Sequence, residues 1–241
     1  MEAASPPTAP RESARPATGP DGFDATYDIV VVGGGGAGLP TALFARWLGN
    51  RVLVLEKAPE LGGTARKAAF WYWVPNNQPM RELGLEDPRD DCLRYMARLA
   101  RPHRYRPDAP RFGLTEWEYA VCEAIYDGAS PATELLAERD ALPYRHCAAV
   151  PDYWCELPED KVPTGGTLDT KAGPKATPDG QVLDDQDRPI PGLYGVGNCV
   201  ASASAQAYWA GGATLGPILA LAHRAARAAH AERVAEPQPV S

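Results

Sequence analysis

The sequence predicts an α/β fold, and three features along the chain predict it. An apolar segment, residues 27–32, runs directly into a glycine-rich segment, residues 33–38. Residues 39–48 then read as a helix, and residues 51–55 as a second apolar strand. Residues 189–222 carry no charged side chain, which is typical of a buried wall. Strand, glycine turn, helix and strand in this order are typical of a Rossmann-like dinucleotide-binding domain.

The glycines indicate where a phosphate group would bind. Gly33, Gly35 and Gly38 fall on the three glycines of G-x-G-x-x-G. The first permits a tight turn, the second lets the backbone approach a pyrophosphate, and the third allows the helix to pack closely on the strand. The N–H groups at the start of the helix would hold the anion. An ordinary glycine-rich turn is the alternative, and the order of the surrounding elements favours the dinucleotide site.

The residues after the second strand indicate which dinucleotide. Glu56 lies roughly 20 residues beyond the glycines, where a carboxylate accepts hydrogen bonds from ribose hydroxyls. Residues 62–64 form a second glycine loop, which flavoproteins use against the phosphates. Residues 190–198 read as a short buried strand that delivers a polar side chain, and residues 214–217 open a helix toward a flavin ring. The predicted cofactor is FAD, and its predicted binding residues are Gly33, Gly35, Gly36, Ala37, Gly38, Glu56, Lys57, Gly63, Thr64, Gly197, Asn198, Thr214 and Leu215.

Several of these motifs together resemble the fumarate reductase and succinate dehydrogenase flavoprotein family, and most closely its 3-ketosteroid Δ1-dehydrogenase branch. The similar segments are residues 56–64, 73–77, 191–198 and 208–217, in that order. The resemblance implies a FAD-binding domain of the two-dinucleotide-domain flavoprotein type. It also implies an FAD-dependent oxidoreductase that dehydrogenates a carbon–carbon bond adjacent to a ketone, or catalyses the reverse reduction.

The chain departs from this family in its middle. Family members are longer and carry a cap or substrate domain there. Residues 151–158 resemble the entry to that domain, and residues 165–168, which resemble its exit, follow almost at once. The prediction is a reduced or absent cap domain. The predicted domains are a disordered leader (1–23), an FAD-binding domain (24–235) with a mainly helical insertion (87–158), and a disordered tail (236–241).

Local signals place the remaining elements. Residues 89–100 follow an Asp-Pro pair and read as a helix. Thr115 and Glu118 have capping-box spacing for a helix over residues 116–126, and Pro131 opens a separate helix that ends near residue 139. Asp179-Gly180 predicts a hairpin, and residues 217–234 form the last helix.

The resemblance also implies catalytic residues. It places a ketone-binding phenol at Tyr208 and a backbone N–H at Gly212, which together would form an oxyanion hole. Packing of Tyr208 and Trp209 against the flavin is an equally weighted alternative. Tyr126 resembles a tyrosine of the active-site wall, although core packing on a helix is favoured there. Residues 70–73 either line an apolar pocket or form a buried strand.

Composition limits the classes of partner. The 241-residue chain has a formal net charge of −7, which argues against nucleic acid and anionic membranes. Its five cysteines lack C-x-x-C spacing, so no metal site is predicted, and reduced thiols fit a cytoplasmic protein. Glycines and prolines in the charge-free stretch argue against a membrane span. The predicted partners are a small apolar ketone such as a steroid, and a homo-oligomer or partner chain that covers Trp71, Trp73 and Trp154.

Three functional classes remain to be compared. An enzyme is the leading prediction. The second is a non-catalytic FAD-binding remnant, or a subunit whose active site a partner chain completes, because the family's remaining catalytic tyrosine would lie in the missing region. The third, an NAD-only Rossmann protein, is disfavoured by the second glycine loop and by the C-terminal flavin motif.

Overall fold

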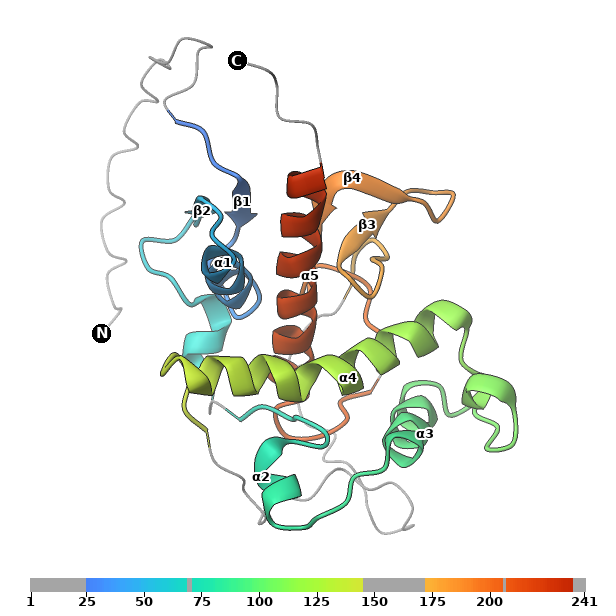
Figure 1. Cartoon of the computed structure of the whole chain (residues 1–241). Helices are drawn as coiled ribbons and strands as arrows, with labels where there is room; N and C mark the ends of the chain where they lie inside the picture. The colour runs from blue at the N-terminus through green and yellow to red at the C-terminus, as the bar shows by residue number, and fades with distance from the viewer. Residues whose placement is uncertain (1–24, 69–70, 145–171, 206, 236–241) are drawn as a thin grey trace, which may run out of the picture.

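The computed structural model describes residues 25–68, 71–144, 172–205 and 207–235 (Figure 1). The predicted leader and tail, the cap entry and exit motifs, Phe70 and Trp154 lie outside these residues. The helices are α1 (Gly38–Trp47), α2 (Gln78–Glu82), α3 (Arg89–Ala100), α4 (Glu116–Glu138) and α5 (Leu215–Ala235), with short 3-10 turns at Gly63–Lys67 and Pro110–Gly113. The strands are β1 (Ile29–Val32), β2 (Val52–Leu55), β3 (Gln181–Leu183) and β4 (Pro189–Tyr194).

The first strand pair is parallel. β1 and β2 run in register from Ile29 opposite Val52 to Val32 opposite Leu55, with α1 as the crossover between them. The predicted strand, helix and strand are therefore present at the expected positions. The side chain of Val31 is buried, whereas Val30 and Val32 on the other face are 51% and 83% exposed. Within the described ranges, β1 pairs with β2 alone.

The second strand pair is an antiparallel hairpin of β3 and β4. A bridge between Ala176 and Val182 closes a turn around Gly180, whose φ is +81°, so the chain turns at the predicted Asp179-Gly180 position. The prediction of a buried strand was wrong for β4, because most of its residues are exposed and Leu193 is 47% exposed. Among the described strands β4 pairs with β3 alone.

Helices form the core. α5 runs between the two strand pairs in Figure 1, and α4 crosses below it. Trp209, just before α5, is 1% exposed and donates its indole N–H to the Met96 carbonyl of α3 at 3.2 Å. A second cluster joins α1, α4 and α5 through Phe44, Leu136 and Leu219. The apolar burial that stabilises the fold is thus concentrated between helices.

The structure has one long helix where the sequence predicted two. α4 continues through Pro131, which the prediction placed at the start of a separate helix. Proline inside a helix costs about 3 kcal/mol. Packing offsets that cost: an ideal Cβ on Gly128 would lie 3.4 Å from the Ala220 Cβ of α5, so the two helices approach closely there. The predicted capping box is confirmed, since Thr115 and Glu118 cap each other's backbone N–H groups.

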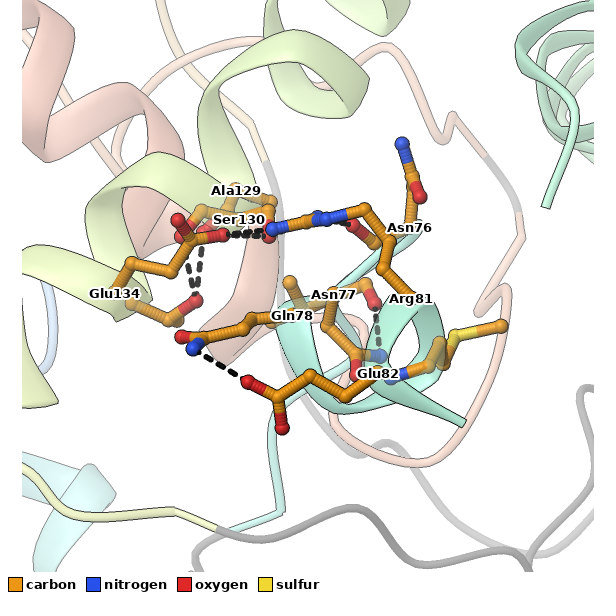
Figure 2. Close-up of polar contacts among 11 residues, drawn as sticks. Asn76, Asn77, Gln78, Arg81, Glu82, Ala129, Ser130 and Glu134 are labelled. Carbon is orange, nitrogen blue, oxygen red and sulfur yellow. Dashed lines mark hydrogen bonds and ion pairs between the residues drawn. The ribbon is translucent and has the colours of Figure 1, made fainter. Parts of the chain in front are cut away.

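A polar cluster attaches α2 to α4 (Figure 2). The Asn77 side chain accepts a backbone N–H in the first turn of α2 and donates to the Val74 carbonyl at 2.9 Å. From the same turn, Arg81 donates to Glu134 at 2.7 Å and to the Ser130 hydroxyl at 3.1 Å on α4. These contacts hold the segment that follows Trp73 against the helical core.

Candidate functional site

One cleft collects most of the residues that the sequence singled out. Its volume is 1410 Å³, and it lies between the segment after β1, the start of α5 and the segment after β4. Its walls include the predicted residues Gly33, Gly35, Gly36, Ala37, Gly38, Thr64, Asn198, Tyr208, Gly212, Thr214 and Leu215. The structure therefore brings together positions from both ends of the chain.

The glycine turn after β1 requires glycine at Gly33, because of its positive φ, and at Gly38, because of its close packing. Gly33 has a φ of +101°, and an ideal Cβ on Gly38 would lie only 1.8 Å from the Gly33 carbonyl oxygen. At Gly35 an added Cβ would meet nothing within 4 Å, so open space lies in front of this residue. No side chain caps the N-terminus of α1. The turn can therefore present backbone N–H groups to an anion at the start of a helix.

The second glycine loop packs on the first. The Gly62 N–H donates to the Gly34 carbonyl at 2.7 Å. An ideal Cβ on Gly63 would lie 3.4 Å from the Gly35 Cα, and one on Gly36 would lie 3.1 Å from the Ala65 Cβ. Thr64, in the same loop, lines the cleft. This contact explains why glycines occur in both loops.

The Glu56 carboxylate joins the two loops at the edge of the cleft. Its two oxygens accept the N–H groups of Ala58 and Gly34, each at 2.8 Å. These hydrogen bonds, that of Ala58 first, hold the pKa of Glu56 below its ordinary value. An ionised carboxylate has further lone pairs, so Glu56 can also accept from ribose hydroxyls. Lys57 beside it is exposed and, like Glu56, is outside the cleft lining.

The C-terminal residues approach the same turn. An ideal Cβ on Gly197 would lie 2.8 Å from the Ala37 Cβ, so a side chain there would push Asn198 away from α1. Leu215, at the start of α5, lies 3.3 Å from the ideal Cβ position of Gly36. The N-terminal ends of α1 and α5 therefore meet at the glycine turn.

Tyr208 and Gly212 are in direct contact within the cleft. The Gly212 N–H donates to the Tyr208 hydroxyl at 3.2 Å. Gly212 has a φ of +86°, and its carbonyl accepts the Trp73 N–H at 3.1 Å. An ideal Cβ on Gly212 would lie 2.6 Å from the Trp71 backbone, which excludes any larger residue. A substrate oxygen that replaced the Tyr208 hydroxyl as acceptor of the Gly212 N–H could accept hydrogen bonds from both groups.

The structure does not bring Tyr126 to this pair. Its hydroxyl donates to the Asp87 carbonyl at 2.6 Å, and its ring packs among buried residues that include Cys92. Burial, and then the nearby Asp87, raise the pKa of Tyr126. Tyr126 is not part of the cleft lining. Its position matches the core-packing interpretation.

The aromatic residues at 71–73 divide between cleft and core. Trp71 is 41% exposed and lines the cleft. Trp73 is partly buried and packs on Trp209 with ring centroids 5.7 Å apart. No strand forms at residues 71–73. The Gly212 backbone occupies the space beside them.

Other cleft residues were not singled out by the sequence. The wall also includes the whole length of β1, and Ala225, Ala226 and Ala229 of α5. Charged residues lie at the far end, where the Tyr194 hydroxyl donates to Glu232. The alanine spacing along α5 could have indicated a close approach of another element.

Two features are absent from the residues that the structure describes. These residues contain no group of three or more His, Cys, Asp or Glu side chains placed to hold a metal ion. None of the described helices combines the length and the apolar character that crossing a bilayer requires.

Comparison with known proteins assigns the family. The FAD binding domain family matches residues 28–146 and 158–215. This chain belongs to that family. FAD is therefore its cofactor, and the predicted flavoprotein fold is confirmed. The described residues fit FAD, because the cleft has open space at Gly35 and a helix start for the pyrophosphate, and Glu56, outside the cleft lining, has spare acceptor capacity beside the glycine turn.

The relatives share limited stretches with this chain. A 3-oxosteroid 1-dehydrogenase of Comamonas testosteroni is 45% identical over 143 residues, which cover 59% of this chain and 22% of the relative. A 4-oxocyclohexanecarboxylate 2-dehydrogenase of Sinomonas cyclohexanicum is 42% identical over 76 residues, 32% of this chain and 13% of the relative. The solved 3-ketosteroid Δ1-dehydrogenase of Sterolibacterium denitrificans is 30% identical with a TM-score of 0.44, over 55% of this chain and 21% of that one. In all three comparisons, less than a quarter of the relative is matched.

Proposed function

We propose that this chain is the FAD-binding part of an oxidoreductase that dehydrogenates a carbon–carbon bond next to a ketone, or catalyses the reverse reduction. The observation that carries the proposal is the position of the Tyr208 hydroxyl and the Gly212 N–H, which lie 3.2 Å apart in the cleft. The glycine turn lines the same cleft. The names of the relatives support a cyclic ketone as substrate, such as a 3-ketosteroid or a smaller ring.

Each residue group has a separate task in this proposal. Bound FAD supplies the two-electron acceptor for the hydride that leaves the substrate carbon. The glycine turn and the start of α1 would hold the pyrophosphate, and Glu56 would hold the ribose. The ketone oxygen would replace the Tyr208 hydroxyl as acceptor of the Gly212 N–H, and the hydroxyl would donate to the same oxygen. They stabilise the negative charge that develops on this oxygen as the neighbouring carbon loses its proton.

A second candidate is a non-catalytic FAD-binding remnant, or a subunit whose active site a partner chain completes. The position of Tyr126 favours it, because its hydroxyl is bound to Asp87 outside the cleft. Tyr194 does line the cleft, but burial and then its hydrogen bond to Glu232 raise its pKa, so it is a poor proton acceptor. In the subunit form of this candidate, the proton acceptor would come from the partner chain.

An anaerobic flavin assay tests the proposal. A 3-keto steroid should bleach the flavin absorbance of the FAD-loaded chain, and Tyr208→Phe should slow bleaching by roughly 10² to 10³ with FAD still bound. Tyr126→Phe is the matched control and should leave the rate unchanged. If the parent chain is not bleached by steroids or smaller cyclic ketones, the second candidate is favoured. Equal rates for the parent and Tyr208→Phe would exclude the hydroxyl from catalysis.

The same proposal includes a cytoplasmic location and association with itself or another chain. The reduced cysteines at Cys92 and Cys122 and the exposed Trp71 support these two points. Light scattering of the purified chain tests whether it associates with itself.

A further inference from the structure

The segment from Tyr208 to Gly212 has an irregular backbone, although it carries both groups of the proposed ketone-binding pair. It forms no helix or strand. A turn closes its end, where the Ala213 N–H donates to the Ala210 carbonyl at 3.0 Å and encloses Gly212. The backbone dihedral angles of the enclosed residues define such a turn. The direction of the Gly212 N–H therefore depends on how the peptide groups beside this turn are held.

Helix α3 holds the peptide group that precedes the turn. The Tyr95 hydroxyl donates to the Trp209 carbonyl. The carbonyl of the next residue, Met96, accepts the Trp209 indole N–H at 3.2 Å. The Trp209 side chain is 1% exposed, so the indole contact is shielded from water. Two consecutive residues of one helix therefore bind Trp209 through both its main chain and its side chain.

Trp73 connects the other end of the segment to the same tyrosine. Its backbone N–H donates to the Gly212 carbonyl at 3.1 Å. The centroid of its side-chain ring lies 5.7 Å from that of Trp209 and 6.4 Å from that of Tyr95. Hydrogen bonds from Tyr95 and Trp73 thus hold the two carbonyls at positions 209 and 212, and the rings of these two residues pack on each other.

Tyr95 acts on this segment from outside the cleft. Tyr208, Gly211 and Gly212 line the cleft, whereas Tyr95 does not. A ligand in the cleft would therefore contact the segment, and any effect of the Tyr95 hydroxyl on that ligand must pass through the Trp209 peptide group. Such indirect effects can be large, because misplacing a reacting group by about 1 Å can cost about 10²-fold in rate.

We infer that Tyr95 is a positioning residue for the ketone-binding pair. Its hydroxyl holds the Trp209 carbonyl and thereby sets the directions of the Tyr208 hydroxyl and the Gly212 N–H. The consequence for catalysis rests on the proposed function, whereas the effect on the geometry of the pair does not.

Amide hydrogen exchange of the full chain with FAD added measures that geometry, because the Gly212 N–H donates to the Tyr208 hydroxyl. Tyr95→Phe removes one hydroxyl and keeps the ring. It should speed exchange at Gly212 about tenfold, as expected for a local opening. Exchange at Ile125, in the buried part of α4, corrects for any loss of overall stability. Tyr119→Phe is the matched control and should leave Gly212 unchanged, because Tyr119 packs on the same core cluster outside the cleft.

Anaerobic bleaching of the flavin by a 3-keto steroid measures the consequence for catalysis. At saturating steroid, Tyr95→Phe should slow bleaching by about 10-fold to 10²-fold with FAD still bound. The steroid concentration that gives half the maximal rate should change by less than about threefold, because the misplaced donors stabilise mainly the charge that develops during the reaction. A purely structural role would instead weaken steroid or FAD binding and leave the maximal rate unchanged.

The two measurements separate the failure of this inference from the failure of the proposed function. Unchanged exchange at Gly212 in Tyr95→Phe would overturn the inference, whether or not the steroid bleaches the flavin. Equally faster exchange in Tyr119→Phe would also overturn it, as would bleaching of Tyr95→Phe at the rate of the parent. Faster exchange at Gly212 in Tyr95→Phe alone, with no bleaching of the parent, would support the inference and count against the proposed function.

Discussion

The helical half of this protein and its strand half differ in how completely they are buried. Between α3, α4 and α5, Leu93, Met96 and Trp209 are at most 1% exposed. In β1, Val32 is 83% exposed although its side chain is apolar. The comparison indicates that helix packing stabilises the chain, whereas in our proposal the strands position the glycine turn that would bind FAD. Substitutions in the two halves should therefore have different consequences.

The largest effect should come from the centre of the helical half. Trp209→Ala removes a fully buried indole and its hydrogen bond to Met96, and should lower the free energy of unfolding by about 3 to 5 kcal/mol. Trp71→Ala is the matched control on the cleft surface, where the change should be about 0.5 kcal/mol or less. Denaturant unfolding measures both. Equal losses would mean that the cleft wall stabilises the fold as much as the core does.

A smaller effect should come from the buried carboxylate of Glu118. Its side chain is 5% exposed and pairs with Arg101 and Arg104, besides capping α4 at Thr115. Glu118→Gln should lower the free energy of unfolding by about 2 kcal/mol, because charge-assisted hydrogen bonds are lost. Glu116→Gln, at an 85% exposed position on the same helix turn, is the control and should have little effect.

The Glu118 contribution should also depend on pH. Burial raises the pKa of Glu118, but hydrogen bonds from Thr115 and Arg104 and the charge of Arg101 lower it more, so the folded pKa lies below the ordinary value of 4.5. Its stabilisation is therefore complete above the unfolded pKa and is lost as pH falls through the folded pKa. The stability difference between the parent and Glu118→Gln should shrink below about pH 4. A constant difference down to acid unfolding would contradict this.

A comparable effect on stability, and the sharpest test of the strand half, comes from substituting two glycines of the turn after β1. Gly38→Ala should cost about 2 kcal/mol, because its Cβ would collide with the Gly33 carbonyl. Gly35→Ala meets no protein atom within 4 Å and should leave stability unchanged, yet weaken FAD binding about tenfold. Thermal unfolding and FAD titration of both variants separate these outcomes. Unchanged FAD affinity in Gly35→Ala would move the pyrophosphate site away from this turn.

Local signals made much of the site predictable. The glycine spacing at residues 33–38 and the acid at Glu56 are short-range patterns. The tight turn is present at Gly33 and Gly38, and the Glu56 carboxylate accepts the Gly34 N–H beside it. The helix at residues 89–100 and the capping box at Thr115 also depend on neighbouring residues alone. Such features do not depend on contacts between distant segments, so their residues could be predicted from the amino-acid sequence.

Local features could be predicted from the sequence, whereas features that depend on packing between distant segments could not. The sequence alone determined the order of strand, glycine turn, helix and acid, because backbone conformation and capping are local. Only the tertiary structure decided that α4 passes through Pro131, since its packing on α5 at Gly128 offsets the cost of the proline. It also decided that Tyr126 lies in the core and that β4 stays exposed. Burial depends on which segments meet in space, and a one-dimensional pattern of side chains does not contain that information.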